Sequence, residues 1–354
     1  MREHSRRNTM KLDTTALQRQ TRRIQRLKEV GIGRTTVFVH DECRVILDEL
    51  RPMLLDPAAC EKIKVLDPGS PVRKGSTKAS RENQLSPFRY PGGKSWLVPQ
   101  LKQWLSTISH PVHTFIEPFA GGAMCGLSVA SKNLAKLTVL GELDDEVASV
   151  WEVIFNSADT DFVWLCDQIL KFEVSENSVR EVLSRNEPSA RSKAFKTIVK
   201  NRMQRAGIIA DGAGLLKAGE RGRGLESRWY PETLVDRMKR VRDFSSRVQF
   251  VHCDAFDLIS VHSKDRHAVF LIDPPYTAGG KNAGARLYNH HQLDHDKLFQ
   301  VMSKVAGSFI MTYDDSDEVK GLALKYGFGV EYIPMRSSHH KAHRELMIKK
   351  ISGA

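Results

Sequence analysis

An apolar run that ends in a carboxylate, two prolines and an aromatic ring is the stretch of this sequence best suited to chemistry. Residues 268–272 have the length and β-branched content of a strand buried on both faces, as in a parallel sheet. Asp273, Pro274, Pro275 and Tyr276 follow at its carboxyl end. Proline fixes φ and donates no backbone hydrogen bond, so this turn is stiff and rich in acceptors. Because open α/β sheets bind ligands beyond the carboxyl ends of their strands, the turn predicts a pocket there; a Pro-rich turn without further role is the alternative.

A Gly-rich turn and a second acidic residue follow two earlier predicted strands. Residues 114–117 read as a strand that breaks at Glu117 into Pro118-Phe119-Ala-Gly121-Gly, and the glycines let the backbone approach a ligand closely. Glu142 follows the next predicted strand, about twenty residues later, where βαβ units hold the hydroxyl pair of a ribose. The turn does not match GxGxxG, so a tight strand-to-helix turn beside a solvated acid is the alternative.

Alternation of strands and helices predicts the elements that must position these side chains. Further strands are expected at 137–140, 248–254, 308–314, 327–335 and 344–351, and helices at 96–108, 127–131, 145–156, 193–203, 232–244, 294–306 and 318–326. Glu117, Glu142, Asp254 and Asp273 then fall at the carboxyl ends of strands. This βα order predicts an α/β, doubly wound sheet with a ligand crevice.

The composition favours a cytoplasmic protein with a polyanionic partner. In 354 residues, 41% are hydrophobic, which supplies an ample core, and the five cysteines form no CxxC pair. There is no run of 18 apolar residues and no apolar stretch after the charged N-terminus, so we expect no membrane segment and no export. The formal net charge of +12 favours nucleic acid as a partner, although many basic proteins bind none.

Charge and glycine content divide the chain. We expect an N-terminal appendage at 1–66, whose short basic strand and capped helix resemble a ribbon-helix-helix opening, and a linker at 67–84. The catalytic domain is expected at 85–156 and 248–354, with a mainly helical, basic insertion at 157–247. The candidates for contacts with nucleic acid in this insertion are Lys200, Arg202, Arg205, Arg221, Arg223 and Arg228. The histidine clusters at 290–295 and 339–343 lack a recognisable metal-ligand spacing.

Four segments together resemble, in order, the motifs of the α group of DNA adenine methyltransferases. They are Phe88-Arg-Tyr-Pro-Gly-Gly-Lys94, Phe115-Ile-Glu-Pro-Phe-Ala-Gly121, Glu142-Leu-Asp144 and Asp273-Pro-Pro-Tyr276. Residues 309–316 are similar to a later strand of the family, and the resemblance spans about residues 85–350. Family members usually have Asp at the position of Glu142, and residues 157–247 do not match the members that read GATC, so the recognition sequence stays open.

The resemblance implies a Rossmann-like methyltransferase sheet, S-adenosylmethionine as cofactor, and methylation of the 6-amino group of adenine in double-stranded DNA. By resemblance the cofactor would contact Tyr90, Lys94, Glu117, Pro118, Phe119, Gly121, Glu142, Leu143, Asp254 and Asp273. The catalytic set would be Asp273, Pro274, Pro275 and Tyr276: Asp273 and the Pro274 carbonyl would accept hydrogen bonds from the amine, and Tyr276 would stack on the flipped base.

Two alternatives remain from the sequence. Methylation of the 4-amino group of cytosine needs the same acceptors, but Ser usually precedes the prolines there, and Asp273 favours adenine. A DNA-binding regulator with an inactive methyltransferase fold is the other. A role in restriction-modification, phage biology or regulation, and a monomer or a dimer formed through the appendage, are left open.

Overall fold

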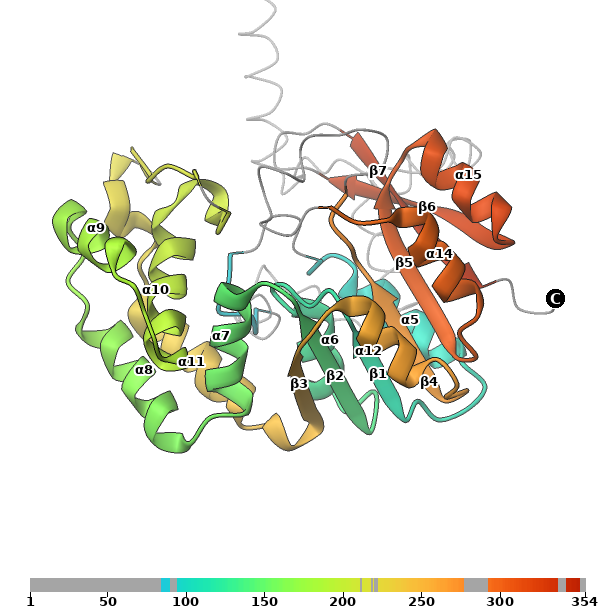
Figure 1. Ribbon diagram of the computed structural model, residues 1–354, viewed down its shortest axis with the longest axis horizontal. Coiled ribbons are helices and arrows are strands. Elements are labelled where there is room, and N and C mark those ends of the chain that lie inside the picture. Colours follow the sequence, from blue (N-terminus) through green and yellow to red (C-terminus); the bar gives the residue numbers. More distant parts are fainter. Residues whose placement is uncertain are drawn as a thin grey trace, which may run out of the picture. The chain divides into compact units, whose positions relative to one another are not determined.

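A seven-stranded sheet forms the centre of the described structure (Figure 1). This computed structural model describes residues 84–89, 94–210, 212–217, 219, 222–276, 292–336 and 342–350, all within one compact unit, Thr77–Ala354. The predicted appendage at 1–66, nearly all of the linker at 67–84, Tyr90 and Arg221 lie outside the described residues.

The strands follow the order β3-β2-β1-β4-β5-β7-β6. Their bounds are β1 Thr114–Glu117, β2 Leu137–Glu142, β3 Val248–His252, β4 Ala268–Ile272, β5 Ser308–Asp314, β6 Phe328–Arg336 and β7 Ala342–Lys350. Strands β1 to β5 are parallel, whereas β7 runs antiparallel to β5 and β6. The predicted Rossmann-like sheet is confirmed. Its strand order reverses between β1 and β4, where open α/β sheets form a crevice for ligands.

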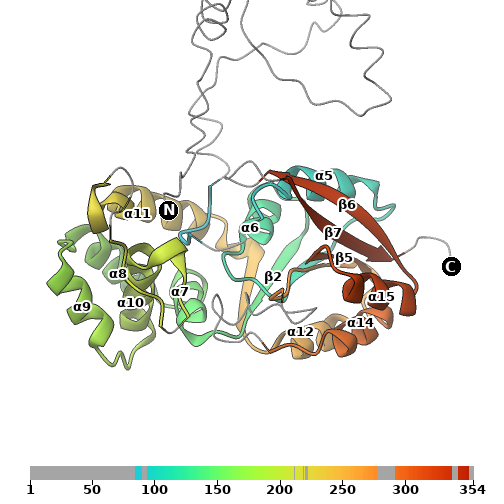
Figure 2. The same cartoon turned by 90° about the horizontal axis from the view of Figure 1, so that it is seen from above.

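Helices cover both faces of the sheet, because successive side chains of a strand point to opposite sides. In β4, Val269 and Leu271 pack with α5 (Val98–Thr107) and α6 (Met124–Ser131), whereas Phe270 and Ile272 pack with α12 (Ala255–His262) and α14 (His295–Ser303). Figure 2 shows these two layers, with α15 (Asp317–Lys325) on the side of α12 and α14. All five residues of β4 are buried, as the apolar run predicted.

Acidic side chains cap the N-termini of two helices that follow strand ends. Asp144 accepts hydrogen bonds from Glu146 N and Val147 N at the start of α7 (Asp145–Phe155), and Asp254 accepts one from Phe256 N at the start of α12. The helix α6 begins at Met124, three residues before the predicted start, after Ala123 in a left-handed conformation with φ of 50°.

Four helices from the predicted insertion gather beside the β3 edge of the sheet (Figure 1). They are α8 (Asp159–Lys171), α9 (Glu176–Ser184), α10 (Ala190–Met203) and α11 (Pro231–Arg242). With α7 they enclose an apolar core that contains Trp151, Ile198 and Met238. The mainly helical character of 157–247 is thus as predicted, while the domain boundaries stay a prediction. None of the described helices has both the length and the apolar character needed to cross a membrane.

Candidate active site

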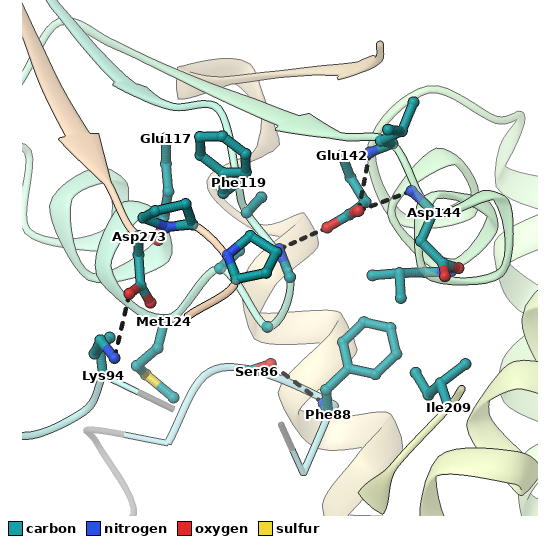
Figure 3. A pocket seen from close by; sticks show the side chains of 18 of the residues that line it. Ser86, Phe88, Lys94, Glu117, Phe119, Met124, Glu142, Asp144, Ile209 and Asp273 are labelled. Atoms are coloured by element: carbon teal, nitrogen blue, oxygen red, sulfur yellow. Dashed lines mark hydrogen bonds and ion pairs between the residues drawn. The ribbon is translucent and has the colours of Figure 1, made fainter. Parts of the chain in front are cut away.

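A cavity of about 1020 Å³ opens at the carboxyl ends of β1, β2 and β4. The predicted residues that line it are Lys94, Glu117, Pro118, Phe119, Gly121, Glu142, Leu143, Asp254, Asp273, Pro274, Pro275 and Tyr276. Lys94 and Asp273 lie at one end of the pocket, and Glu142 and Asp144 at the other (Figure 3). Strand ends that are far apart in sequence therefore meet in one hollow, as the parallel order of the sheet requires.

Glu142 fixes the Gly-rich turn from the end of β2. Its Oε2 accepts a hydrogen bond from Gly121 N at 2.7 Å, and its Oε1 accepts bonds from Leu143 N at 2.9 Å and Asp144 N at 2.8 Å (Figure 3). Trp151 Nε1 donates to Gly121 O at 2.9 Å, so both backbone groups of that glycine are held. Burial raises the pKa of Glu142 to about 7, although the three amide donors favour its ionised form.

Glu117 holds the other side of the same turn. Its Oε2 accepts a hydrogen bond from Gly126 N at 2.7 Å, near the start of α6. The carboxyl is buried, and this burial raises its pKa to about 8. The charge of Asp273 adds to the shift, and the Gly126 bond opposes it. A neutral Glu117 therefore predominates at neutral pH, and its visible role is to fix the loop.

Asp273 is held by three donors through a single oxygen. Its Oδ1 accepts hydrogen bonds from Tyr276 Oη at 2.9 Å and Thr312 Oγ1 at 2.7 Å, and lies 3.2 Å from Lys94 Nζ. Among the described residues, none donates a hydrogen bond to Asp273 Oδ2 or to the Pro274 carbonyl. Both residues line the cavity, so these two acceptors are candidates for a substrate amine.

Glu345 is a member of this cluster that sequence reasoning missed. Its Oε2 lies 3.5 Å from Lys94 Nζ and accepts a hydrogen bond from Tyr276 Oη at 3.4 Å. Burial raises the pKa of Glu345 to about 7 against the attraction of Lys94. The pKa of Lys94 is raised because Asp273 and Glu345 outweigh the effect of its burial. One lysine therefore pairs with two carboxylates at the Asp273 end of the cavity.

Lys94 and Tyr276 both contact other side chains of the site, while their predicted roles stay predictions. Lys94, predicted to hold the cofactor, pairs with Asp273 and Glu345. The ring of Tyr276 stacks on Tyr313 with centroids 5.8 Å apart, and Lys94 Nζ lies 4.7 Å from its centroid. We therefore expect one of these contacts to open before a base can stack on Tyr276.

The five basic candidates that the structure describes lie in different surroundings. Lys200 is buried and pairs with Glu146 at 2.6 Å, which leaves it badly placed for a phosphate. Arg205 and Arg223 border a second hollow, of about 1260 Å³, in the helical region. Arg228 donates to Gln204 O at 3.4 Å, and Arg202 is buried in the wall of the first cavity. Within the described residues, no group of three or more His, Cys, Asp or Glu side chains could hold a metal ion.

One protein family matches part of this region. Residues 90–181 match the D12 class N6 adenine-specific DNA methyltransferases. The resemblance inferred from the motifs is thus confirmed there, for the Gly-rich turn and Glu142-Leu-Asp144. The Asp273–Tyr276 turn of this methyltransferase lies beyond the matched residues.

Three methyltransferases are among the solved structures that are similar to this chain. The rRNA methyltransferase aviRa of Streptomyces viridochromogenes is 12% identical over 78% of this chain and 94% of its own, with a TM-score of 0.36. An rRNA methylase of Streptococcus thermophilus is 8% identical over 72% and 95%, with a TM-score of 0.31. The magnesium protoporphyrin IX methyltransferase of Synechocystis, solved with bound SAM, is 10% identical over 89% and 100%, with a TM-score of 0.30. A search of curated proteins gives no match. At these TM-scores the likenesses carry no weight for substrate or cofactor.

Proposed function

We propose that this methyltransferase transfers a methyl group from S-adenosylmethionine to the 6-amino group of adenine in a specific sequence of double-stranded DNA. The observation that carries the proposal is the pair of acceptors at the end of β4. Asp273 and Pro274 line the cavity that the Gly-rich turn and Glu142 also line.

The donors and acceptors of the cavity fit S-adenosylmethionine. A carboxylate has about four lone-pair positions, and Glu142 uses three of them on backbone amides, which leaves one for a ribose hydroxyl. Asp254, Leu143 and Phe256 line the cavity too and offer an acceptor and apolar surface for an adenine ring. When bound, the cofactor supplies an electrophilic methyl group on a sulfonium.

Asp273 and Pro274 supply what the amine of adenine lacks. The lone pair of this amine is delocalised into the ring, so the amine is a weak nucleophile. Hydrogen bonds from its N–H groups to Asp273 Oδ2 and to the Pro274 carbonyl would favour a geometry in which the lone pair points out of the ring plane. Asp273 Oδ2 can also accept the proton that the nitrogen gives up. Lys94, Tyr276 and Thr312 hold the carboxylate in place through Oδ1.

A base inside a duplex cannot reach an enclosed pocket, so the adenine must flip out of the stack, at a cost of a few kcal/mol.

The basic helical region beside the β3 edge would contact the DNA backbone. Arg205 and Arg223 are exposed there, and we retain both as candidates for phosphate contacts, whereas Lys200 is not retained.

Transfer of a labelled methyl group to DNA tests the proposal. We expect the wild type to label double-stranded DNA and Asp273→Ala to lose at least about a hundredfold in rate, because general acid–base groups contribute at that scale. Asp167→Ala, which removes an exposed carboxylate of α8, is the matched control and should retain the wild-type rate. Equal rates for Asp273→Ala and the control would refute the role of the β4 turn. No labelling of DNA by the wild type would favour an inactive, regulatory fold.

A further inference from the structure

Two arginines from the helical region enter the wall of the cavity. Arg202, from α10, and Arg237, from α11, line it beside the segment 84–89. Arg202 Nη2 donates to Pro87 O. Arg237 donates to Ser86 O at 3.4 Å and to Gln84 Oε1 at 2.5 Å. Each guanidinium therefore uses only some of its five N–H donors on the segment 84–89.

Within the described part of the chain, neither guanidinium forms an ion pair with a carboxylate. Asp236 raises the pKa of Arg237 from a distance, but its ion pair is with Arg240. The side chain of Arg202 is 4% exposed, and its Nε is buried without a hydrogen-bond partner. Burial, followed by the charges of Arg237, Arg89 and Arg228, lowers the pKa of Arg202 to about 9, so it is still a cation at neutral pH. Burial and the charge of Arg240 also lower the pKa of Arg237. Like charges gathered in a buried wall are costly unless an anion joins them.

The segment beside the arginines has a separate anchor. Asn201 Oδ1 accepts a hydrogen bond from Arg89 N at 2.9 Å, and Asn201 Nδ2 donates to Arg89 O at 3.1 Å and Gly207 O at 2.7 Å. Because Asn201 already holds the segment 84–89, two buried or half-buried arginines are not needed to fix its backbone. The surplus positive charge points to a ligand.

We propose that Arg202 and Arg237 form an anion subsite, lined also by Arg89, that binds a backbone phosphate next to the flipped adenine. The inference rests on the proposed function and names a ligand for this wall of the cavity. The planar fork of arginine matches phosphate oxygens in pairs. The buried fork of Arg202 is already oriented before the ligand arrives, and Arg237 beside it is half-buried. A base that enters the cavity brings its own phosphates to the walls, because only the sugar separates them from the base. The carboxylate of S-adenosylmethionine is also an anion that arginine can bind, and the experiment distinguishes it from a DNA phosphate.

The test compares three full-length variants with the wild type. Arg237→Gln removes a charge and keeps donors for Ser86 O. Arg202→Lys keeps the charge and loses the fork. Lys239→Gln is the matched control, because it removes one exposed charge from the same helix. For each protein we would measure the affinity for duplex DNA across salt concentrations, the affinity for S-adenosylmethionine, and the rise in Tm with inorganic phosphate against chloride at equal ionic strength.

We expect Arg237→Gln to bind DNA about tenfold more weakly, with a salt slope reduced by about 1, since one phosphate contact is lost. Its affinity for S-adenosylmethionine should be unchanged, and phosphate should no longer raise its Tm above the value in chloride. Arg202→Lys should keep the slope and lose most of the phosphate-dependent rise in Tm. Lys239→Gln should keep that rise.

Two results would overturn the subsite. Weaker binding of the cofactor with unchanged DNA binding would assign the arginines to the cofactor carboxylate. The arginine variants could instead show a lower Tm in chloride but a wild-type salt slope and a wild-type rise in Tm with phosphate. That result would show that the two arginines only hold the segment 84–89. None of these readouts requires methyl transfer. If the wild type methylates adenine and Arg237→Gln keeps the wild-type salt slope of DNA binding, the subsite is refuted and the proposed activity stands. If Arg237→Gln has a reduced salt slope but the wild type methylates no adenine, the proposed activity is refuted and the subsite stands.

Discussion

At the scale of single residues, three buried glutamates surround the cavity, and burial raises the pKa of each. The values are about 8 for Glu117 and about 7 for Glu142 and Glu345. A carboxyl whose folded pKa lies above its unfolded value binds more protons in the folded state. Its contribution to stability is complete below the unfolded pKa and is lost as pH rises through the folded pKa.

Glu117→Gln tests this effect where the shift is largest. The wild type should lose free energy of unfolding, relative to the variant, as pH rises from about 4.5 to about 8. The reason is that, over this range, the carboxyl ionises in the unfolded chain while burial keeps it protonated in the folded protein. The amide of the variant stays neutral in both states and can still accept the bond from Gly126 N. Urea denaturation of both proteins at several pH values measures the difference. Parallel pH curves would show that Glu117 is ionised throughout the range.

The sequence identified residues of the site only where they sit in a local pattern. Asp273 and Glu142 follow apolar strands directly, so a strand prediction is enough to find them. Glu345 belongs to a late antiparallel strand and reaches the site because β7 pairs with β5, with Glu345 opposite Asp314. Arg237 lies on an ordinary basic helix. No spacing in the chain reveals such contacts, because the pairing of distant elements creates them.

At the scale of elements, the start of α6 depends on a glycine. A Cβ on Gly126 would lie 2.6 Å from Glu117 Oε2 and 2.5 Å from Leu140 Cδ2, both in the packed interior. Any side chain there must push the carboxyl or the strand β2 away. The predicted start of α6 at Leu127 was too late, since Met124 to Gly126 already form its first turn.

Gly126→Ala should destabilise the protein by about 1–3 kcal/mol through overpacking, despite the better helix propensity of alanine. The control, Gly321→Ala on α15, meets no atom within 4 Å and should raise stability by about 0.5–1 kcal/mol. Chemical denaturation measures both changes. A stabilising Gly126→Ala would mean that the close packing of the turn is not as described.

Strands were easier to predict than helix ends. The apolar runs that became β4 and β5 sit between helical layers, so their burial on both faces is visible in the sequence. Helix ends depend on caps and left-handed residues such as Ala123, whose conformation its residue type does not indicate.

At the scale of the whole molecule, part of the positive charge of the helical region is used inside the fold. Lys193 pairs with Asp145 and Lys200 with Glu146, so these lysines join α10 to α7. Arg202 is buried and lines a cavity. A count of charges in the sequence does not distinguish such an arginine from one on the surface. The predicted domain boundaries, the DNA partner and the role of residues 1–66 stay predictions.

The identity of the methylated base tests the central claim most directly. The full chain would be incubated with S-adenosylmethionine and duplex DNA of mixed sequence, and the DNA digested to nucleosides for mass spectrometry. Our account predicts N6-methyldeoxyadenosine as the product, and its loss with Asp273→Ala. Methyl groups on the 4-amino group of cytosine, or in RNA and not in DNA, would contradict it.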